Sequence, residues 1–209
     1  MTDRELIDRA NEIIERLFAL DDAIANARGL RALLEDLHAR DLSIVLEPHV
    51  AAIAMVRAGI LRAAVSVVIA CLDPKDRRGN RASVGQILDM LRDAKLVAVF
   101  PEAGTSPDSG AEVLRQVRHD YGVLVEDDLF KRGKRLRNDA IAHILIPDDP
   151  TPTVPYDTIY RLHDSAERLV VGLYRVCDRG TPQFLARQAQ LIEHAKVFWD
   201  TYFHGMQSH

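Results

Sequence analysis

The apolar positions of this chain recur at the three- and four-residue spacing of helices along nearly its whole length. Near the N-terminus Thr2 precedes Glu5 by three residues, which is the pattern of a capping box. Apolar residues then follow at helical spacing: Leu6, Ile13, Ile14, Leu17 and Leu20. We therefore expect a first helix that begins after Thr2 and a second, short helix over residues 30–39.

Prolines and loop residues divide the rest of the chain. Asp73-Pro74 ends a long helix over residues 44–72, because the residue before a proline resists the helical conformation. Further helices are predicted over residues 83–96, 111–121, 124–145, 156–177 and 182–203. Four prolines within residues 146–155 exclude a helix there. The apolar run 96–100 fits either a short strand or a helix end. The pattern predicts an all-α fold, a bundle of about seven or eight helices.

The same pattern suggests three parts. Residues 1–43 form an N-terminal helical segment, residues 44–178 a helical core, and residues 179–209 a C-terminal helix that packs on the core. The chain has 209 residues, of which 47% are apolar, enough for a well-packed interior. We therefore expect an ordered protein.

Composition argues against several classes of protein. The net charge is −4, so no overall positive field draws the chain to nucleic acid, and any such contact must be local. The two cysteines, Cys71 and Cys177, are far apart, and no metal-ligand cluster is apparent, so we expect no metal and no cofactor. The charged N-terminus is unlike a signal peptide, and Arg57 and Arg62 interrupt the most apolar stretch. We expect a cytoplasmic protein that does not span a membrane.

A basic run stands out against this acidic background. Residues 131–137 read Lys-Arg-Gly-Lys-Arg-Leu-Arg, five positive charges in seven positions, and Asn138, Ala142 and His143 follow. At 100° per residue, an apolar seam forms along this helix from Leu129, Gly133, Leu136, Ala140 and Ile144. Arg137 lies at one edge of the seam and His143 at the other. The seam can meet its own copy across a two-fold axis or pack on another helix of the same chain.

The segment 137–143 resembles the signature of the HEPN superfamily of helical nucleic-acid proteins. That signature is an arginine, a polar residue, a few further positions and then a histidine near the end of a helix. Here these are Arg137, Asn138 and His143, with five residues between arginine and histidine. A similar spacing, with six residues between arginine and histidine, occurs at Arg31/His38 and Arg187/His194. The basic residues before Arg137 and the Ala142-His143 ending therefore distinguish this segment. Residues 53–91 are similar to an abortive-infection branch, and the resemblance extends over about residues 45–175.

The resemblance implies an RNA-cleaving enzyme, a toxin or antiviral effector, that works without a metal. The ribose 2′-hydroxyl would attack the adjacent phosphate, with His143 exchanging a proton and Arg137 binding phosphate oxygens. Asn138 would orient the phosphate or His143. The resemblance also implies a homodimer through the helix that carries Arg137 and His143, and an antitoxin protein is a possible partner. Basic residues would contact the RNA backbone: Lys131, Arg132, Lys134 and Arg135, with Arg77 and Arg78 in the loop after Pro74.

Two other functions fit the same residues. HEPN folds also occur as non-catalytic modules that bind RNA, a nucleotide or a protein partner, so a matching motif does not establish catalysis. In a purely structural interaction protein, Arg137 and His143 would pair with acidic neighbours such as Asp139. Burial of both side chains within one protomer would favour that third possibility.

Overall fold

The computed structural model describes residues 2–42, 45, 47–74, 82–100, 110–142 and 156–207. Within these residues the chain forms nine helices and no strand, which confirms the all-α class. The helices are α1 (Asp3–Ala39), α2 (Glu47–Leu72), α3 (Val84–Met90), α4 (Ala94–Val97), α5 (Gly110–Glu126), α6 (Asp128–Ala142), α7 (Tyr156–Val176), α8 (Gln183–Ala186) and α9 (Gln188–Gln207). Two of them, α4 and α8, are single turns of four residues.

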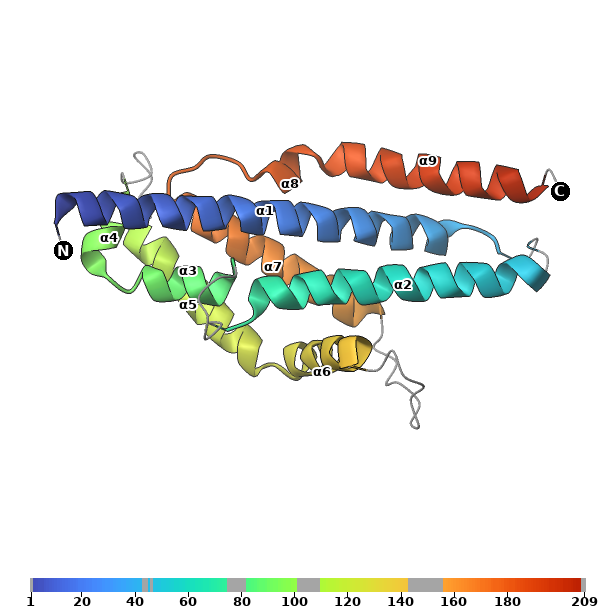
Figure 1. Ribbon diagram of the computed structural model, residues 1–209, viewed down its shortest axis with the longest axis horizontal. Helices are drawn as coiled ribbons and strands as arrows, with labels where there is room; N and C mark the ends of the chain where they lie inside the picture. The colour runs from blue at the N-terminus through green and yellow to red at the C-terminus, as the bar shows by residue number, and fades with distance from the viewer. Residues whose placement is uncertain are drawn as a thin grey trace.

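The long helix α1 runs between α9 and α2 (Figure 1) and also packs against α7. Its start follows the predicted capping box: the Thr2 backbone N–H donates to Glu5 at 2.7 Å, and the Glu5 N–H donates to the Thr2 hydroxyl at 3.3 Å. The break expected before residue 30 does not occur. Ala27 and Leu34, on either side of that point, are both buried against neighbouring helices. Because this packing continues past residue 30, α1 is one helix of 37 residues, about 55 Å long.

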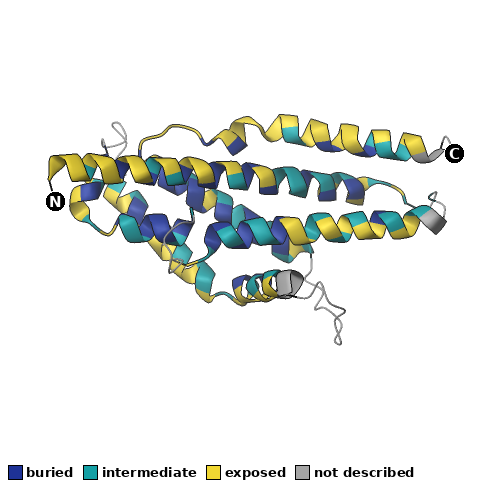
Figure 2. Cartoon of the chain, in the orientation of Figure 1, coloured by how far each residue is buried: buried dark blue, intermediate teal, exposed yellow. Residues whose placement is uncertain are grey.

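One large hydrophobic cluster takes buried residues from α1 to α7 and Phe184 of α8 (Figure 2). A second, smaller cluster joins Leu37, Ile53 and Trp199 from α1, α2 and α9. The indole N–H of the fully buried Trp199 donates to the carbonyl of Leu33 at 2.8 Å. This aromatic side chain therefore fixes α9 on α1.

Several other helix boundaries differ from the sequence prediction, and the break predicted at residues 122–123 lies inside α5. The predicted helix over residues 124–145 is divided at Asp127, whose carboxylate accepts the Leu129 N–H at 2.7 Å and so caps α6. The predicted helix over residues 182–203 has a turn at Arg187 between α8 and α9. The predicted helix over residues 83–96 is divided into α3 and α4. The Asp93 side chain caps the start of α4 by accepting from the Lys95 N–H, and the ambiguous run 96–100 belongs to α4 and the turn after it.

The short helix α8 is tied to α1 and α7 by one buried carboxylate. Asp21, only 1% exposed, accepts hydrogen bonds from the Tyr174 hydroxyl at 2.5 Å and from the backbone N–H groups of Gln183 at 2.7 Å and Phe184 at 3.1 Å. Burial, together with the hydrogen bond to Asp21, raises the pKa of Tyr174. The start of α8 therefore has a fixed position beside α7.

The apolar stretch of α2 is long enough, by length and composition alone, to cross a membrane. It covers His49–Leu72 with a mean hydropathy of 1.9. Core helices of soluble proteins meet the same criterion. Val65, Ile69 and Leu72 lie in the main hydrophobic cluster, but only 28% of the apolar window is buried. A single helix of this kind is weak evidence for a membrane span.

Candidate nucleic-acid interface

The buried face of α6 packs inside its own chain. Gly133 approaches α2 and α7 so closely that a Cβ atom there would lie 2.8 Å from Ile69 Cδ1 and 3.0 Å from Leu162 Cδ1. Leu136 is buried in the same core. The sequence left open whether the seam meets a second copy or another helix of the same chain. For Gly133 and Leu136 the structure shows the second arrangement, while the side chains of Ala140 and Ile144 lie outside the described residues.

Arg137 is held at the edge of this contact. Its Nη1 donates a hydrogen bond to a carboxylate oxygen of Asp73, which directly follows α2. Its Nε and Nη2 both approach the side-chain oxygen of Asn138, at 3.3 and 3.2 Å. The Arg137 side chain is only 15% exposed. The guanidinium therefore has a defined orientation before any ligand binds.

Asp73 itself lies at a junction of four helices. The Tyr121 hydroxyl of α5 donates to the Leu72 carbonyl at 3.1 Å. At Gly85 of α3, a Cβ atom would lie 3.1 Å from the Asp73 carbonyl oxygen and 2.4 Å from the Tyr121 hydroxyl. Burial, with a smaller contribution from the charge of Asp73, raises the pKa of Tyr121 to about 12. Tyr121 therefore stays a neutral hydrogen-bond donor and helps to fix the end of α2.

The cations of α6 divide into two groups. Lys134 turns toward Asp73, with its Nζ 3.4 Å from the second carboxylate oxygen, and Lys131 is 3.4 Å from Glu126. Arg132 and Arg135 are exposed on the side of α6 away from Gly133, and neither forms an ion pair with a described residue. These two arginines are the charges of α6 most available to a phosphate backbone.

Three predicted residues fall outside the part of the chain that the structure describes. His143 follows Ala142, the last residue of α6, and Arg77 and Arg78 lie between Pro74 and Ala82 in the sequence. The predicted opposition of Arg137 and His143 across the seam is therefore untested. Asn138 is exposed and, as described above, accepts from Arg137.

The second Arg–His pair has a structural explanation. Arg31 donates to Glu35 at 2.7 Å and to Asp164, and its guanidinium lies over the Tyr160 ring at 4.7 Å. His38 packs edge-on against the ring of Tyr156, with 4.2 Å between ring centroids. Both residues are thus engaged where α1 meets α7, which separates them from the Arg137 segment.

Sequence reasoning missed a buried charged cluster between α1 and α7. His163 is 2% exposed, and its Nδ1 lies 3.4 Å from Glu167 and 3.5 Å from Arg31. Burial first, then the charges of Arg31 and Arg28, lower the pKa of His163 to about 4. The histidine is therefore neutral at physiological pH, and its pKa is too low for efficient proton transfer there.

The same cluster could be mistaken for a metal centre. Ligand atoms of His163, Asp164 and Glu167 lie within 4.8 Å of one another. However, Arg31 already donates to Asp164, and Arg28 lies 3.2 Å from Glu167. Two guanidinium groups beside these ligand atoms would repel a cation. The arrangement fits a salt-bridge network. Its only signal in the sequence is helical spacing: residues 28 and 31 share one face of α1, and residues 163 and 167 share one face of α7.

The two cysteines offer no nucleophile. Cys71 and Cys177 are both buried in the main core. Burial raises the pKa of each thiol to about 12, so neither forms an appreciable thiolate at neutral pH. Among the described residues, the α6 surface with Arg132, Arg135, Arg137 and Asn138 is therefore the best candidate for a functional site.

Comparisons with models of protein families, with curated protein sequences and with solved structures found no match to this chain.

Proposed function

We propose that this chain is a HEPN-type ribonuclease in which Arg137, Asn138 and His143 act on RNA. The observation that supports this most directly is the fixed placement of Arg137. Its guanidinium is oriented by Asp73 and Asn138, and the same helix presents the exposed cations Arg132 and Arg135 to solvent. An oriented guanidinium beside exposed positive charge suits a phosphate ester, which arginine binds through two parallel hydrogen bonds.

Arg137 keeps donors for a phosphate in this arrangement. A guanidinium has five N–H groups. One Nη1 hydrogen is directed to Asp73, and the Nε and one Nη2 hydrogen are directed to Asn138. One hydrogen on each terminal nitrogen therefore stays free for two phosphate oxygens. Arg137 can bind RNA without releasing Asp73.

The proposed reaction is internal transesterification. The ribose 2′-oxygen forms a bond to the adjacent phosphorus, and the bond from phosphorus to the 5′-oxygen of the next nucleotide breaks. One proton leaves the 2′-hydroxyl and one reaches the departing 5′-oxygen, and His143 is the group assigned to this exchange. Arg137 offsets the charge that develops on the non-bridging oxygens. The products are a 2′,3′-cyclic phosphate end and a 5′-hydroxyl end.

A second candidate is a HEPN-like module that binds RNA, a nucleotide or a protein partner without cleavage. The Arg137–Asp73 pair is consistent with it, because this contact orients the guanidinium without requiring catalysis. For a purely structural interaction protein the sequence suggested Asp139 as the acidic partner, whereas the partner is Asp73, which directly follows α2. The two candidates differ in whether covalent products form.

The partners proposed with this function are RNA, a second copy of the chain and an antitoxin protein. Dimerisation through α6 would have to use residues beyond Leu136, since Gly133 and Leu136 are buried against α2 and α7 of the same chain. This limits the size of any α6 contact between copies.

The test is cleavage of total RNA by wild-type protein, Arg137→Ala and His143→Ala. We expect both variants to lose cleavage while circular dichroism and gel filtration stay unchanged. Arg187→Ala/His194→Ala is the matched control, because this pair has a similar spacing and both residues are exposed. Equal cleavage by wild type and both α6 variants would disprove the assignment, and RNA binding without products would favour the binding module.

A further inference from the structure

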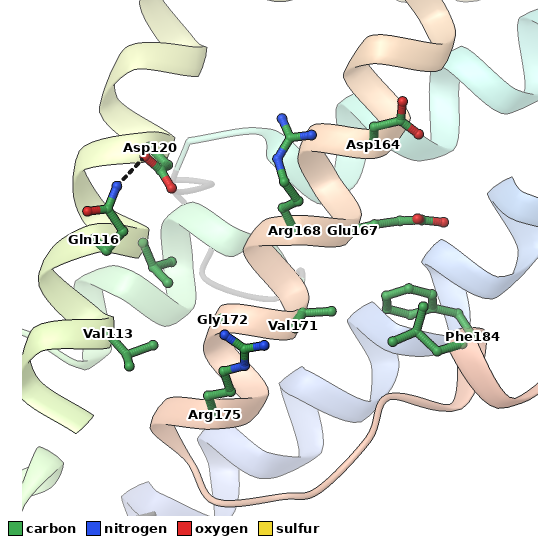
Figure 3. A pocket seen from close by; sticks show the side chains of 12 residues that line it. Val113, Gln116, Asp120, Asp164, Glu167, Arg168, Val171, Gly172, Arg175 and Phe184 are labelled. Atoms are coloured by element: carbon green, nitrogen blue, oxygen red, sulfur yellow. Dashed lines mark hydrogen bonds between the residues drawn. The ribbon is translucent and has the colours of Figure 1, made fainter. Parts of the chain in front are cut away.

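A groove runs between α5, α7 and α8 on a part of the molecule that the proposed RNA site does not use. Its volume is about 480 Å³. Figure 3 shows Arg168 and Arg175 projecting from α7 beside it. The residues that line the groove include Val113 of α5, Arg168, Val171 and Arg175 of α7, and Phe184 and Leu185 of α8. The groove thus combines an apolar floor with two arginines on one wall.

The two arginines are free to bind a partner. Both are exposed, and neither forms an ion pair with a described residue. Among the residues that the structure describes, Arg168 donates only to the Ser165 hydroxyl, at 2.9 Å. The acidic residues at the end of the groove are already paired, Asp164 with Arg31 and Glu167 with Arg28. Asp120 on the α5 wall accepts from Gln116 at 2.8 Å. The unpaired charge on the α7 wall is therefore positive.

These arginines follow a regular pattern along α7. Arg168 and Arg175 are seven residues apart, which places them on one side of the helix about 10.5 Å apart. Val171 lies between them, three residues after the first and four before the second, so all three side chains are neighbours on the helix surface. Along the wall, a positive side chain, an apolar side chain and a second positive side chain follow one another: Arg168, Val171 and Arg175.

The exposed side of α1 carries the complementary pattern. Glu15 and Asp22 are also seven residues apart, and Phe18 lies three residues after the first and four before the second. Both acidic residues are exposed, and neither forms an ion pair with a described residue. Phe18 is 46% exposed although it is a large aromatic side chain. This surface presents the sequence negative, apolar, negative at the spacing of the α7 wall.

We propose that the chain forms a dimer in which the Glu15–Phe18–Asp22 surface of each protomer packs on the Arg168–Val171–Arg175 wall of the other. Charge and spacing match over two helical turns, and Phe18 meets Val171 of the wall and the neighbouring Leu185 of α8. The Phe18 ring lies 6.4 Å from the ring of Tyr174 in the same protomer, so the two surfaces lie on neighbouring faces. A two-fold axis can therefore form both contacts at once and close the assembly.

The test is the mass of the protein in solution by light scattering after gel filtration, over a concentration series into the tens of micromolar. We expect wild type to reach the mass of two chains, and to dissociate more readily at high salt because the paired charges lie near the surface. Glu15→Arg/Asp22→Arg and Arg168→Glu/Arg175→Glu should each weaken association by about tenfold or more. These residues are exposed, and the fold of each variant is checked by circular dichroism.

Mixing the two charge-reversed proteins provides the decisive comparison. Every contact between the unlike chains is again opposite in charge, so the mixture should dimerise although neither protein does so alone. The matched control is Arg132→Glu/Arg135→Glu, which changes the charge equally on the exposed face of α6 and should leave the dimer intact. A monomeric wild type would overturn the proposal. So would unchanged association of the reversed variants, failure of the mixture to dimerise, or dissociation by the α6 control alone. None of these results depends on RNA cleavage.

Discussion

Arg137 of α6 donates a hydrogen bond to Asp73, a residue 64 positions earlier that directly follows α2. This contact joins the candidate RNA-binding helix to the main core, and Lys134 shares the same carboxylate at 3.4 Å. The relationship makes Asp73 a positioning residue, because it orients the guanidinium without contacting RNA in the proposed arrangement.

Asp73→Asn should lower the free energy of unfolding by about 1–3 kcal/mol, because two cations at a partly buried position lose their counter-charge. The loss can be measured by urea unfolding. Asp120→Asn is the control, because the side chain of the exposed Asp120 forms a hydrogen bond only with Gln116 among the described residues and its replacement should change stability little. Equal stability of Asp73→Asn and wild type would mean that the pair contributes nothing to the fold.

Gly133→Ala should destabilise the protein by about 1–3 kcal/mol, because the added methyl group would overlap Ile69 and Leu162. Gly122→Ala on α5 is a matched comparison. No atom lies within 4 Å of a Cβ at Gly122, so alanine should stabilise that helix by about 0.5–1 kcal/mol. Thermal unfolding of both variants measures the difference, and an unchanged midpoint for Gly133→Ala would show that α6 packs elsewhere.

His163 should make stability depend on pH in acid. Its pKa is about 4 in the folded protein and about 6.5 when unfolded, so the unfolded chain binds more protons between these values. Its contribution is therefore constant above pH 6.5 and becomes unfavourable as pH falls toward 4, by about 3 kcal/mol in total. The charged groups around it are Arg28 and Arg31 of α1 and Asp164 and Glu167 of α7.

The measurement for His163 is the difference in unfolding free energy between wild type and His163→Gln at pH 7.5 and pH 4.5. Titration of the other carboxylates largely cancels in this difference. We expect the unfolding free energy of His163→Gln to rise relative to that of wild type as the pH falls from 7.5 to 4.5. Parallel pH profiles would show that His163 does not titrate below its usual range.

Arg132→Ala/Arg135→Ala should weaken RNA binding and reduce its salt dependence. Each phosphate contact to a single strand contributes about 0.7 to the slope of log affinity against log salt, so the slope should fall by about 1.4. Lys131→Ala should have a smaller effect, because Lys131 already pairs with Glu126. Filter binding at several salt concentrations measures both slopes. An unchanged slope for Arg132→Ala/Arg135→Ala would show that these α6 arginines do not contact the RNA backbone.

Features that depend on a few adjacent residues could be predicted from the sequence. The Thr2–Glu5 capping box forms as expected, and the Ser83 hydroxyl accepts from the Gln86 N–H at 3.3 Å at the start of α3. The end of α2 at Leu72, before Asp73-Pro74, also follows from local chemistry. Such signals act within one helical turn, so no knowledge of the fold is needed to interpret them.

Features that depend on distant residues could not be predicted. The partner of Arg137 comes from another helix, and the pairing of Arg31 with Asp164 joins residues 133 positions apart. The continuity of α1 past residue 30 likewise depends on packing against other helices, which overrides local signals. The packing partner of the α6 seam, a helix of the same chain or a second copy, also depends on distant residues. The sequence offered both, and the burial of Gly133 and Leu136 decides it for these residues.

The most direct test of the central proposal is the chemistry of RNA ends after incubation with purified protein in EDTA. We expect new fragments with 2′,3′-cyclic phosphate and 5′-hydroxyl ends for wild type and for Arg187→Ala/His194→Ala, and no fragments for His143→Ala. Intact RNA with the wild-type protein, or equal amounts of the same ends with His143→Ala, would contradict it.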